Sequence, residues 1–240
     1  MKINQTCWMM TAAPGLLACR LVFISETHAT VLVPDKLVLS QSCDLFFRAY
    51  GKVGRRCYVV RQVADKAELA ISDMDRHYYA THALTLARHP SETDERLMVR
   101  LLAFALFADE RLQFGKGLSS DDEPDLWRKD LTGDILEWID LGQPDEQRIR
   151  RACGRARQVV IMNYSGRGAD IWWEKNRTAL GRSKNLTVID IAEPAVDALA
   201  AMATRNMRLQ CLIQDRQVQL FGEDSAGAVT IEPNVRMAPQ

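Results

Sequence analysis

Hydrophobic and polar residues alternate over residues 66–71 (KAELAI), as they do in a strand that buries one of its faces. The polar residues Ser72 and Asp73 then end this alternation. Over residues 97–106, apolar side chains cover most of a helical circumference, which is typical of a largely buried helix. A capping-box pattern at 91–94 precedes them. We therefore predict a strand followed by a buried helix that ends near Ala108.

The centre of the chain alternates short strands with helices. Strands at 126–129 and 135–141 flank the turn sequence TGD, so we predict a hairpin here. Pro144 should open a second helix that runs to Gly154. The remaining predicted elements are a strand at 159–162, a helix around 172–175, a strand at 186–191, a helix at 194–203, a hairpin over 208–221 that turns at 214–215, and an edge strand at 229–231. This pattern predicts a fold of the α/β (α+β) class, with a mixed central sheet and helices on both faces.

Residues 1–57 show little periodicity beyond an apolar strand at 30–33, and we place a domain boundary near residue 57. Four of the six cysteines lie in this segment. No cysteine has the spacing of a zinc site, which favours a reduced, cytoplasmic protein. The uncharged run that follows Lys2 and ends at Cys19 also resembles a lipoprotein signal, but a Pro-Gly pair interrupts it and Arg20 follows it directly.

The composition limits the partners that this chain can bind. Of its 240 residues, 47% are hydrophobic, which is enough for a sizeable core. Its 31 basic residues balance 31 acidic ones, so any nucleic-acid binding has to come from a local patch. This balance excludes a histone-like binder but not a nuclease. No other uncharged run approaches the roughly 20 residues that a membrane helix needs, and we expect no membrane association.

Three acidic residues are spaced as in a metal-dependent phosphodiesterase. Glu95 falls within the apolar arc of the first helix, where a carboxylate needs a partner or a function. If Asp130 pairs with Ile135 in the hairpin, Asp125 lies opposite Asp140, and facing side chains have Cβ atoms about 5 Å apart. A register shifted by one residue would place these two carboxylates on opposite faces.

A structural interpretation of the same acids is also open. Glu92 and Asp94 suit the first turn of the helix, where negative charge offsets the helix dipole. Glu95 suits an ion pair with an arginine. Asp125 can simply begin a strand, with Glu123 exposed in the loop before it.

Carboxylates from a strand pair and a neighbouring helix form an all-oxygen site suited to Mg²⁺ or Mn²⁺. Such an ion lowers the pKa of a bound water and neutralises charge on a phosphodiester. Several nearby side chains would orient that water or contact the phosphate. They are the basic residues Arg151, Lys129, Arg96 and Arg100, together with the uncharged Gln143.

The motifs around these residues resemble those of the YaeQ family, small bacterial proteins with a PD-(D/E)XK nuclease-like fold. They are ARHPSETDER, FADERLQF, DDEP followed by Trp127, WIDLG, PDE followed by the basic run 148–151, and the pair Trp172 and Trp173. The resemblance covers roughly residues 66–239. We therefore expect a YaeQ-like domain over residues 58–240. Residues 1–57 form an extension outside this domain. An upstream start codon or a misread frame would explain it. The sequence does not show whether these residues are folded.

The resemblance implies a restriction-endonuclease-like αβββαβ core, to which the hairpin over 208–221 is a C-terminal addition. It also implies that Glu95, Asp125 and Asp140 are the catalytic acids and metal ligands. Pro124 and Asp125 match the PD pair of the family pattern.

The sequence departs from the nuclease pattern at Gly142, where a lysine is usual. In some members of the wider superfamily this basic residue has moved to the following helix, which would make Arg151 its replacement. Lys129 is a second candidate for contact with the scissile phosphate. Arginine stabilises charge well but is a poor general base because its pKa exceeds 12.

Two functions follow from these residues. The leading hypothesis is a metal-dependent nuclease or phosphodiesterase that uses Mg²⁺ or Mn²⁺. The alternative is a module that keeps the fold without turnover and binds nucleic acid or protein, for example as a regulatory factor. Its phosphate contacts would come from a helix face that is otherwise merely solvated. The residues on this face are Arg148, Arg150, Arg151, Arg155 and Arg157. A hydrolase based on His77, His82 or His89 is disfavoured, because none has a nucleophile or ligand at a diagnostic spacing.

Overall fold

The structure is a computed structural model, and it describes residues 2–10, 16–24, 29–32, 42–46, 54–58, 64–88, 92–115, 122–223 and 227–239. The chain divides into two compact units, Met1–Val63 and Ala64–Gln240. The part of the first acidic motif formed by His89, Pro90 and Ser91 lies outside the described residues.

The described residues of the first unit form an antiparallel sheet in the order β3-β2-β1-β4-β5. Its strands are β1 (Lys2–Met10), β2 (Leu16–Ile24), β3 (Ala29–Leu32), β4 (Ser42–Phe46) and β5 (Gly54–Tyr58). The strand predicted at 30–33 corresponds to β3. The other strands lack a sustained alternation of apolar and polar residues, so they were not predicted.

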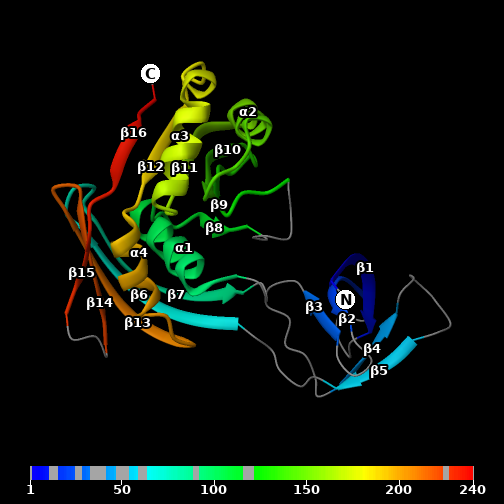
Figure 1. Cartoon of the computed structure of the whole chain (residues 1–240). Coiled ribbons are helices and arrows are strands. Elements are labelled where there is room, and N and C mark those ends of the chain that lie inside the picture. Colours follow the sequence, from blue (N-terminus) through cyan, green and yellow to red (C-terminus); the bar gives the residue numbers. More distant parts are fainter. Residues whose placement is uncertain are drawn as a thin grey trace. The chain divides into compact units, whose positions relative to one another are not determined.

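In its described residues, the second unit contains two mixed sheets and four helices (Figure 1). The helices are α1 (Asp94–Leu106), α2 (Glu146–Arg155), α3 (Arg167–Leu180) and α4 (Glu193–Ala200). A six-stranded sheet has the order β16-β12-β11-β10-β9-β8. Its strands are β8 (Leu112–Phe114), β9 (Leu126–Lys129), β10 (Ile135–Leu141), β11 (Ala156–Asn163), β12 (Leu186–Asp190) and β16 (Asn234–Met237).

The second sheet of this unit has five strands in the order β15-β14-β13-β6-β7. They are β6 (Ala64–Asp73), β7 (Tyr78–Ala87), β13 (Asn206–Gln214), β14 (Gln217–Gly222) and β15 (Val229–Ile231). Both sheets combine parallel and antiparallel pairs: β10, β11 and β12 run parallel to one another, and β6 runs parallel to β13. The predicted mixed α+β architecture is confirmed at this level.

Helices cover both faces of the six-stranded sheet (Figure 1). On one face, Ile149 of α2 and Leu180 of α3 pack against Trp138, Val159 and Ile161 of the sheet. On the other face, α1 and α4 lie between the two sheets and share a second apolar cluster with them. Alternate residues of the central strands therefore enter two separate cores, which explains why these strands are nearly continuous apolar runs.

The first two helices, α1 and α2, begin at other residues than predicted. Thr93 is the N-cap of α1, and its side chain accepts a hydrogen bond from the backbone N–H three residues later (3.3 Å). The predicted capping box began at Ser91. Asp145 caps α2 in the same way (2.7 Å), so Pro144 lies before the cap instead of at the first helical position. In both cases a short oxygen-bearing side chain satisfies a free N–H of the first turn.

Most other predicted elements are confirmed with small changes of length, including the hairpin of β9 and β10. The C-terminal hairpin turns at Asp215 and Arg216, whose φ angles are left-handed (53° and 64°). The strands β7, β8 and β16 were not predicted. In β7 the inward-facing positions include Ala80 and His82, so its hydrophobic contrast is weak.

Two neighbouring residues in the turn between β6 and β7 fasten it to distant elements. Asp75 accepts hydrogen bonds from the backbone N–H groups of Asp215 and Arg216, both at 2.8 Å. Arg76 donates to the carbonyls of Ala105 and Ala108 at 3.2 and 3.3 Å, at the C-terminal end of α1. The turn thereby joins the β13–β14 hairpin and the end of α1.

None of the described helices is long and apolar enough to cross a membrane. The helix α3 has 14 residues, whereas a membrane span needs about 20.

Candidate functional site

Asp125 and Asp140 come together at one end of the β9–β10 hairpin. Trp138 pairs with Trp127, which is the register predicted from the sequence, and its continuation brings Asp125 opposite Asp140. The Asp125 Oδ2 atom accepts a hydrogen bond from the Leu141 N–H at 2.8 Å. Asp125 and Asp140 are only 5% and 2% exposed, so bulk water hardly solvates either carboxylate and each needs partners within the protein.

The other end of the hairpin departs from the prediction. Ile135 pairs with Lys129 instead of Asp130, and a register shift before Glu137 restores the predicted register. Asp130 instead organises the turn, because its Oδ1 atom accepts the backbone N–H groups two and four residues later, both at 2.9 Å.

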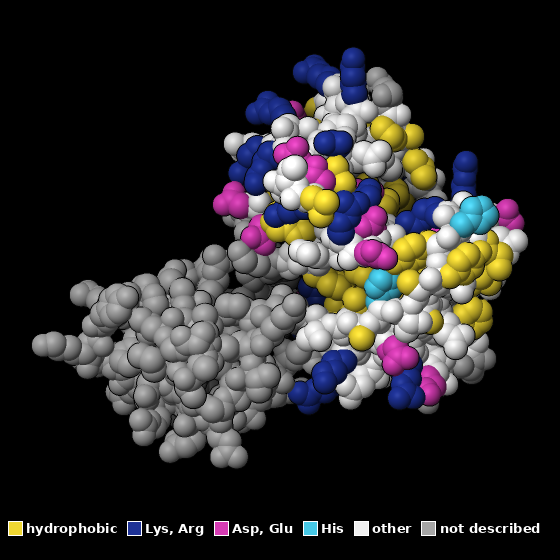
Figure 2. All heavy atoms as spheres, turned by 180° about the vertical axis from the view of Figure 1, so that it is seen from behind, with side chains coloured by type: hydrophobic (Ala, Val, Ile, Leu, Met, Phe, Trp, Pro, Cys, Tyr) yellow, Lys and Arg dark blue, Asp and Glu magenta, His cyan; other side chains and the backbone are white. Residues whose placement is uncertain are grey.

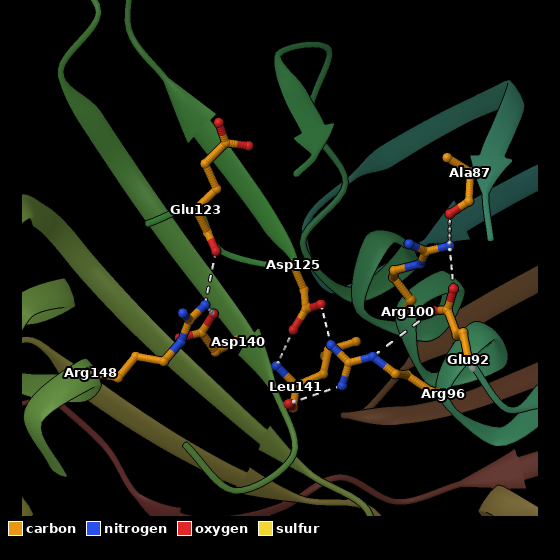
Figure 3. Close-up of polar contacts among 9 residues, drawn as sticks. All are labelled: Ala87, Glu92, Arg96, Arg100, Glu123, Asp125, Asp140, Leu141 and Arg148. Carbon is orange, nitrogen blue, oxygen red and sulfur yellow. Dashed lines mark hydrogen bonds and ion pairs between the residues drawn. The ribbon is translucent and has the colours of Figure 1, made fainter. Parts of the chain in front are cut away.

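Each of the two buried acids binds an arginine (Figure 3). Arg96 of α1 donates to Asp125 and, at 3.3 Å, to the Leu141 carbonyl. Arg148 of α2 binds both oxygens of Asp140, from Nε at 2.8 Å and from Nη2 at 2.7 Å. The same Nη2 atom donates to the Glu123 carbonyl at 2.9 Å. The site therefore joins α1, the hairpin and α2 through charged hydrogen bonds, which are stronger than neutral ones.

A third buried acid, Glu92, extends this network beyond the predicted site. Its carboxylate lies 3.3 Å from Arg100 Nη2 and 4.0 Å from Arg96 Nε. Arg100 also donates to the Ala87 carbonyl at 3.1 Å, which links α1 to the end of β7 (Figure 3). Glu92 precedes the N-cap, so the prediction that it offsets the helix dipole from the first turn is wrong. That prediction holds for Asp94.

Burial and neighbouring charges act in opposite directions on this network. Burial raises the pKa of Asp125, as does the nearby Asp140 carboxylate, while Arg96 and the Leu141 N–H lower it. Burial acts to lower the pKa of Arg96, but Asp125 and the Tyr164 side chain raise it above its ordinary value. The arginine therefore stays charged beside the acid.

Glu95 does not occupy the buried position that its helical projection predicted. It is partly exposed, and hydrogen bonds from the Thr93 hydroxyl and its own backbone N–H lower its pKa. The next residue, Arg96, reaches Asp125 instead. The side chain that α1 contributes to the acidic pair is thus basic.

The remaining predicted residues have other surroundings. The Lys129 ammonium lies 3.4 Å from the centre of the Trp127 ring, a cation–π contact. Arg151 is exposed on α2, and Gln143 is exposed after β10. The Glu123 carboxylate points away from Asp140, and its backbone carbonyl accepts a hydrogen bond from Arg148 (Figure 3).

Gly142 has a structural reason to be glycine. Its φ of +88° is left-handed, and its N–H donates to the Met162 carbonyl at 2.9 Å. A Cβ atom would meet only Tyr164 Cε1, at 3.8 Å, so backbone conformation and not space disfavours a side chain. A lysine at this position would be strained.

The described donor set does not fit a divalent cation. Such an ion requires several carboxylate oxygens that are free to face it. Both oxygens of Asp125 and of Asp140 accept hydrogen bonds from protein groups, and Glu95 is bonded within its own turn. Among the described residues, no group of three or more His, Cys, Asp or Glu side chains is placed to hold a metal.

The outer side of α2 carries a concentration of positive charge, which we call the α2 basic surface. It consists of exposed residues from α2, the start of β11 and the turn before β12, namely Arg150, Arg151, Arg155, Arg157, Arg182 and Lys184. Asn185 Nδ2 donates to the carbonyls of Cys153 and Ala156 at 3.0 and 2.9 Å, which holds these segments together. Figure 2 shows Lys and Arg side chains gathered over the end of the unit that carries α2 and α3, with acidic side chains among them.

Arg148 and Glu92 belong to the network but were not predicted as members of the site. A signal for Arg148 was present: Ile149 and Ala152 form the buried side of α2, and Arg148 lies four residues before Ala152 on the same side. Glu92 gave no such signal, because its position before Thr93 depends on where the helix begins.

The two tryptophans of α3 contribute to an apolar core. Trp172 and Trp173 are partly buried against the apolar cluster beneath α2 and α3, and Trp172 Nε1 donates to the Pro144 carbonyl at 2.9 Å. Among the histidines, His82 Nε2 lies 2.8 Å from the Tyr78 hydroxyl. Burial lowers the pKa of His82, which agrees with a structural role.

Comparison with known proteins identifies the family. Residues 61–232 match the family described as YaeQ protein. The chain is 47% identical over 156 residues to YaeQ of Escherichia coli (strain K12), an alignment that covers 65% of this chain and 86% of that protein. It is 59% identical to the crystal structure of YaeQ from Xanthomonas axonopodis pv. citri, with a TM-score of 0.71 and coverage of 75% and 100%. For the crystal structure of YaeQ from Pseudomonas syringae the identity is 33%, the TM-score 0.70 and the coverage 73% and 96%. The chain therefore belongs to the YaeQ family.

Proposed function

We propose that the Ala64–Gln240 unit is a nucleic-acid-binding module that contacts phosphates through the α2 basic surface, without metal-dependent hydrolysis. The observation that carries this proposal is the exposure of several arginines on one surface of a chain whose net charge is zero. Because the whole molecule exerts no net attraction on a polyanion, a local patch of this kind has to supply it.

The arrangement of these arginines suits contact with a phosphate backbone. Arg151 and Arg155 are four residues apart, so they project from the same side of α2. The Arg157 side chain is 68% exposed, and its contact with Asp130 is long, at 3.7 Å. An exposed pair of this kind contributes little free energy, so a phosphate can compete for the guanidinium group.

We further propose that this module has a nuclease-like fold, and the order of its elements supports this part. From α1 to β11 the chain runs α1, β8, β9, β10, α2, β11, which is the αβββαβ order expected from the sequence. The absence of hydrolysis is supported by the contacts of Asp125 and Asp140, whose oxygens are already bonded to Arg96, Arg148 and a backbone N–H.

A metal-dependent nuclease is the second candidate. One observation favours it: Asp125 and Asp140 lie next to each other, and Asp140 raises the pKa of Asp125. A cation between two such carboxylates would relieve their repulsion. In this candidate, Mg²⁺ or Mn²⁺ would displace the arginines, and Glu95, Arg151 and Lys129 would have to turn towards the hairpin end.

We also propose a cytoplasmic location for this module, where nucleic acid is available. Free cysteines support this part of the proposal. Cys153 and Cys211 are unpaired thiols, as is usual in a reducing compartment.

The binding proposal is tested with fluorescence anisotropy on labelled duplex DNA, single-stranded DNA and RNA over a series of salt concentrations. We expect the full chain to bind at least one of them, with an affinity that falls as salt rises. The Arg150→Gln/Arg151→Gln variant should bind about tenfold more weakly, and each lost phosphate contact should reduce the salt slope by about 1.

The matched control is Lys66→Gln/Arg208→Gln, which removes the same charge from exposed positions on β6 and β13. Equal weakening in both double variants, or no binding by the wild type, would contradict the proposal. Cleavage of the probes that needs Mg²⁺ or Mn²⁺ and is lost in Asp140→Asn would favour the second candidate instead.

A further inference from the structure

We infer that Arg96 and Arg148 take the place of a divalent cation at the junction of α1, the β9–β10 hairpin and α2. In this arrangement Asp125 and Asp140 form structural ion pairs with the two arginines and are not metal ligands. The inference goes beyond nucleic-acid binding and does not depend on it.

The charges of this junction balance without a metal. Its buried carboxylates belong to Glu92, Asp125 and Asp140, and the guanidinium groups that face them belong to Arg96, Arg100 and Arg148. The two hairpin acids together carry two negative charges. Arg96 and Arg148 supply the two positive charges that a single Mg²⁺ or Mn²⁺ ion would otherwise bring.

The hydrogen-bond geometry also replaces what a metal would provide. A cation at this point would tether the ends of the hairpin to the neighbouring helices. Here Arg148 spans Asp140 and the Glu123 carbonyl, and Arg96 spans Asp125 and the Leu141 carbonyl. A guanidinium group suits this task because its donors lie in one plane and bind two acceptors at once.

The junction is largely buried as well as neutral. The side chains of Arg96 and Arg148 are 14% and 19% exposed, and those of Asp125 and Asp140 are 6% and 2% exposed. A hydrated cation would have to displace a guanidinium group and leave that charge without its partner. This displacement is costly in a buried site, so the wild type should not respond to divalent cations.

Gly142 agrees with this interpretation. In metal-dependent nucleases a lysine near this position acts together with the metal, but a lysine at residue 142 would be strained because the φ angle of Gly142 is left-handed. The positive charge at the junction comes instead from helices on either side of the hairpin. Arg148 is a positioning residue: its contact with Asp140 fixes the position of α2 and therefore of the exposed arginines on that helix.

The experiment compares thermal unfolding and calorimetric titration of the full chain with MnCl₂ and MgCl₂. We expect millimolar metal to leave the melting temperature of the wild type unchanged. The Arg96→Met/Arg148→Met variant should gain Mn²⁺ binding, with a rise in Tm of about 3 to 6 °C at a tenfold excess over the Kd. Adding Asp140→Asn to this variant should abolish the gain.

The control is Arg150→Met/Arg151→Met, which removes exposed arginines from the same helix and should gain no metal binding. A stabilisation of the wild type by Mn²⁺ that Asp140→Asn removes would overturn the inference. So would a folded Arg96→Met/Arg148→Met variant that binds no metal. If that double variant does not fold, the Arg148→Met variant and the wild type provide the same comparison. Because only metal binding is read out, failure here leaves the nucleic-acid proposal standing.

Discussion

Arg148 binds both carboxylate oxygens of Asp140, at 2.7 and 2.8 Å, and this contact joins the first turn of α2 to the end of β10. Asp140 is 2% exposed, so water cannot replace the guanidinium group. The position of α2 against the sheet therefore depends on a charged contact as well as on apolar packing.

Replacement of Arg148 by methionine should destabilise the protein by about 3 kcal/mol, because it leaves Asp140 as a buried charge without compensation. Urea unfolding followed by circular dichroism measures this loss. Arg150→Met is the matched control, since Arg150 is exposed on the same helix, and it should change the free energy of unfolding by no more than about 0.5 kcal/mol. Equal effects of the two substitutions would refute the buried contact.

Two glycines should respond to alanine in opposite directions. Gly142→Ala should cost about 1 to 2 kcal/mol, because the left-handed φ of +88° is unfavourable for a residue with a Cβ atom. Gly154 lies within α2, and a Cβ atom there meets nothing within 4 Å. Gly154→Ala should therefore stabilise by about 0.5 to 1 kcal/mol. Melting temperatures that move in the same direction would contradict this contrast.

The N-cap of α1 can be tested at Thr93. Thr93→Ala should lower the free energy of unfolding by about 1 kcal/mol, because the N–H of Arg96 loses its acceptor. Thr178→Ala is the control, since Thr178 is exposed on α3 and away from its N-terminus. An equal loss of stability in both variants, measured by chemical denaturation, would show that Thr93 is not the cap.

Asp75 should make stability depend on pH in the acid range. Hydrogen bonds from the backbone N–H groups of Arg216 and Asp215 lower its pKa in the folded protein. A lowered folded pKa contributes stability above the unfolded pKa, and that contribution is lost as the pH falls through the folded value. Asp75→Asn should therefore melt at a lower temperature near neutral pH.

The difference between Asp75→Asn and the wild type should shrink as the solution is acidified, because protonation weakens the same hydrogen bonds in the wild type. Melting curves over a pH series measure this convergence. Asp197→Asn, at an exposed position on α4, is the control and should run parallel to the wild type. A constant gap between Asp75→Asn and the wild type at every pH would speak against the linkage.

Local patterns in the sequence were sufficient for much of the fold. The turn residues between β9 and β10 indicated the hairpin, although its pairing beside the turn differs by one residue and reaches the predicted register only from Glu137 onward. The nearly continuous apolar runs of β11 and β12 indicated a sheet covered on both faces. These features depend on residues that are close in sequence, so their period and turn chemistry were enough.

The partners of the acids depend on contacts that no local pattern contains. Whether Glu95 or Arg96 faces the hairpin depends on where α1 begins and how it is rotated, and a shift of one residue turns a helical side chain by about 100°. Arg148 was recognised as basic, but its contact with Asp140 depends on how α2 packs on the sheet. For this reason the sequence predicted the pairing of Trp127 with Trp138 and did not predict the arginines that bind Asp125 and Asp140.

The parallel pairing of β6 with β13 has a consequence for how the chain is made. β6 is the first strand of the second unit, but its parallel neighbour β13 follows only after the four helices and every strand of the six-stranded sheet except β16. During translation, β6 and β7 are synthesised before β13, and the hairpin that they form alone is only marginally stable in water. The five-stranded sheet is therefore among the last parts of the unit to close, and a stop codon before β13 would leave β6 paired with β7 alone.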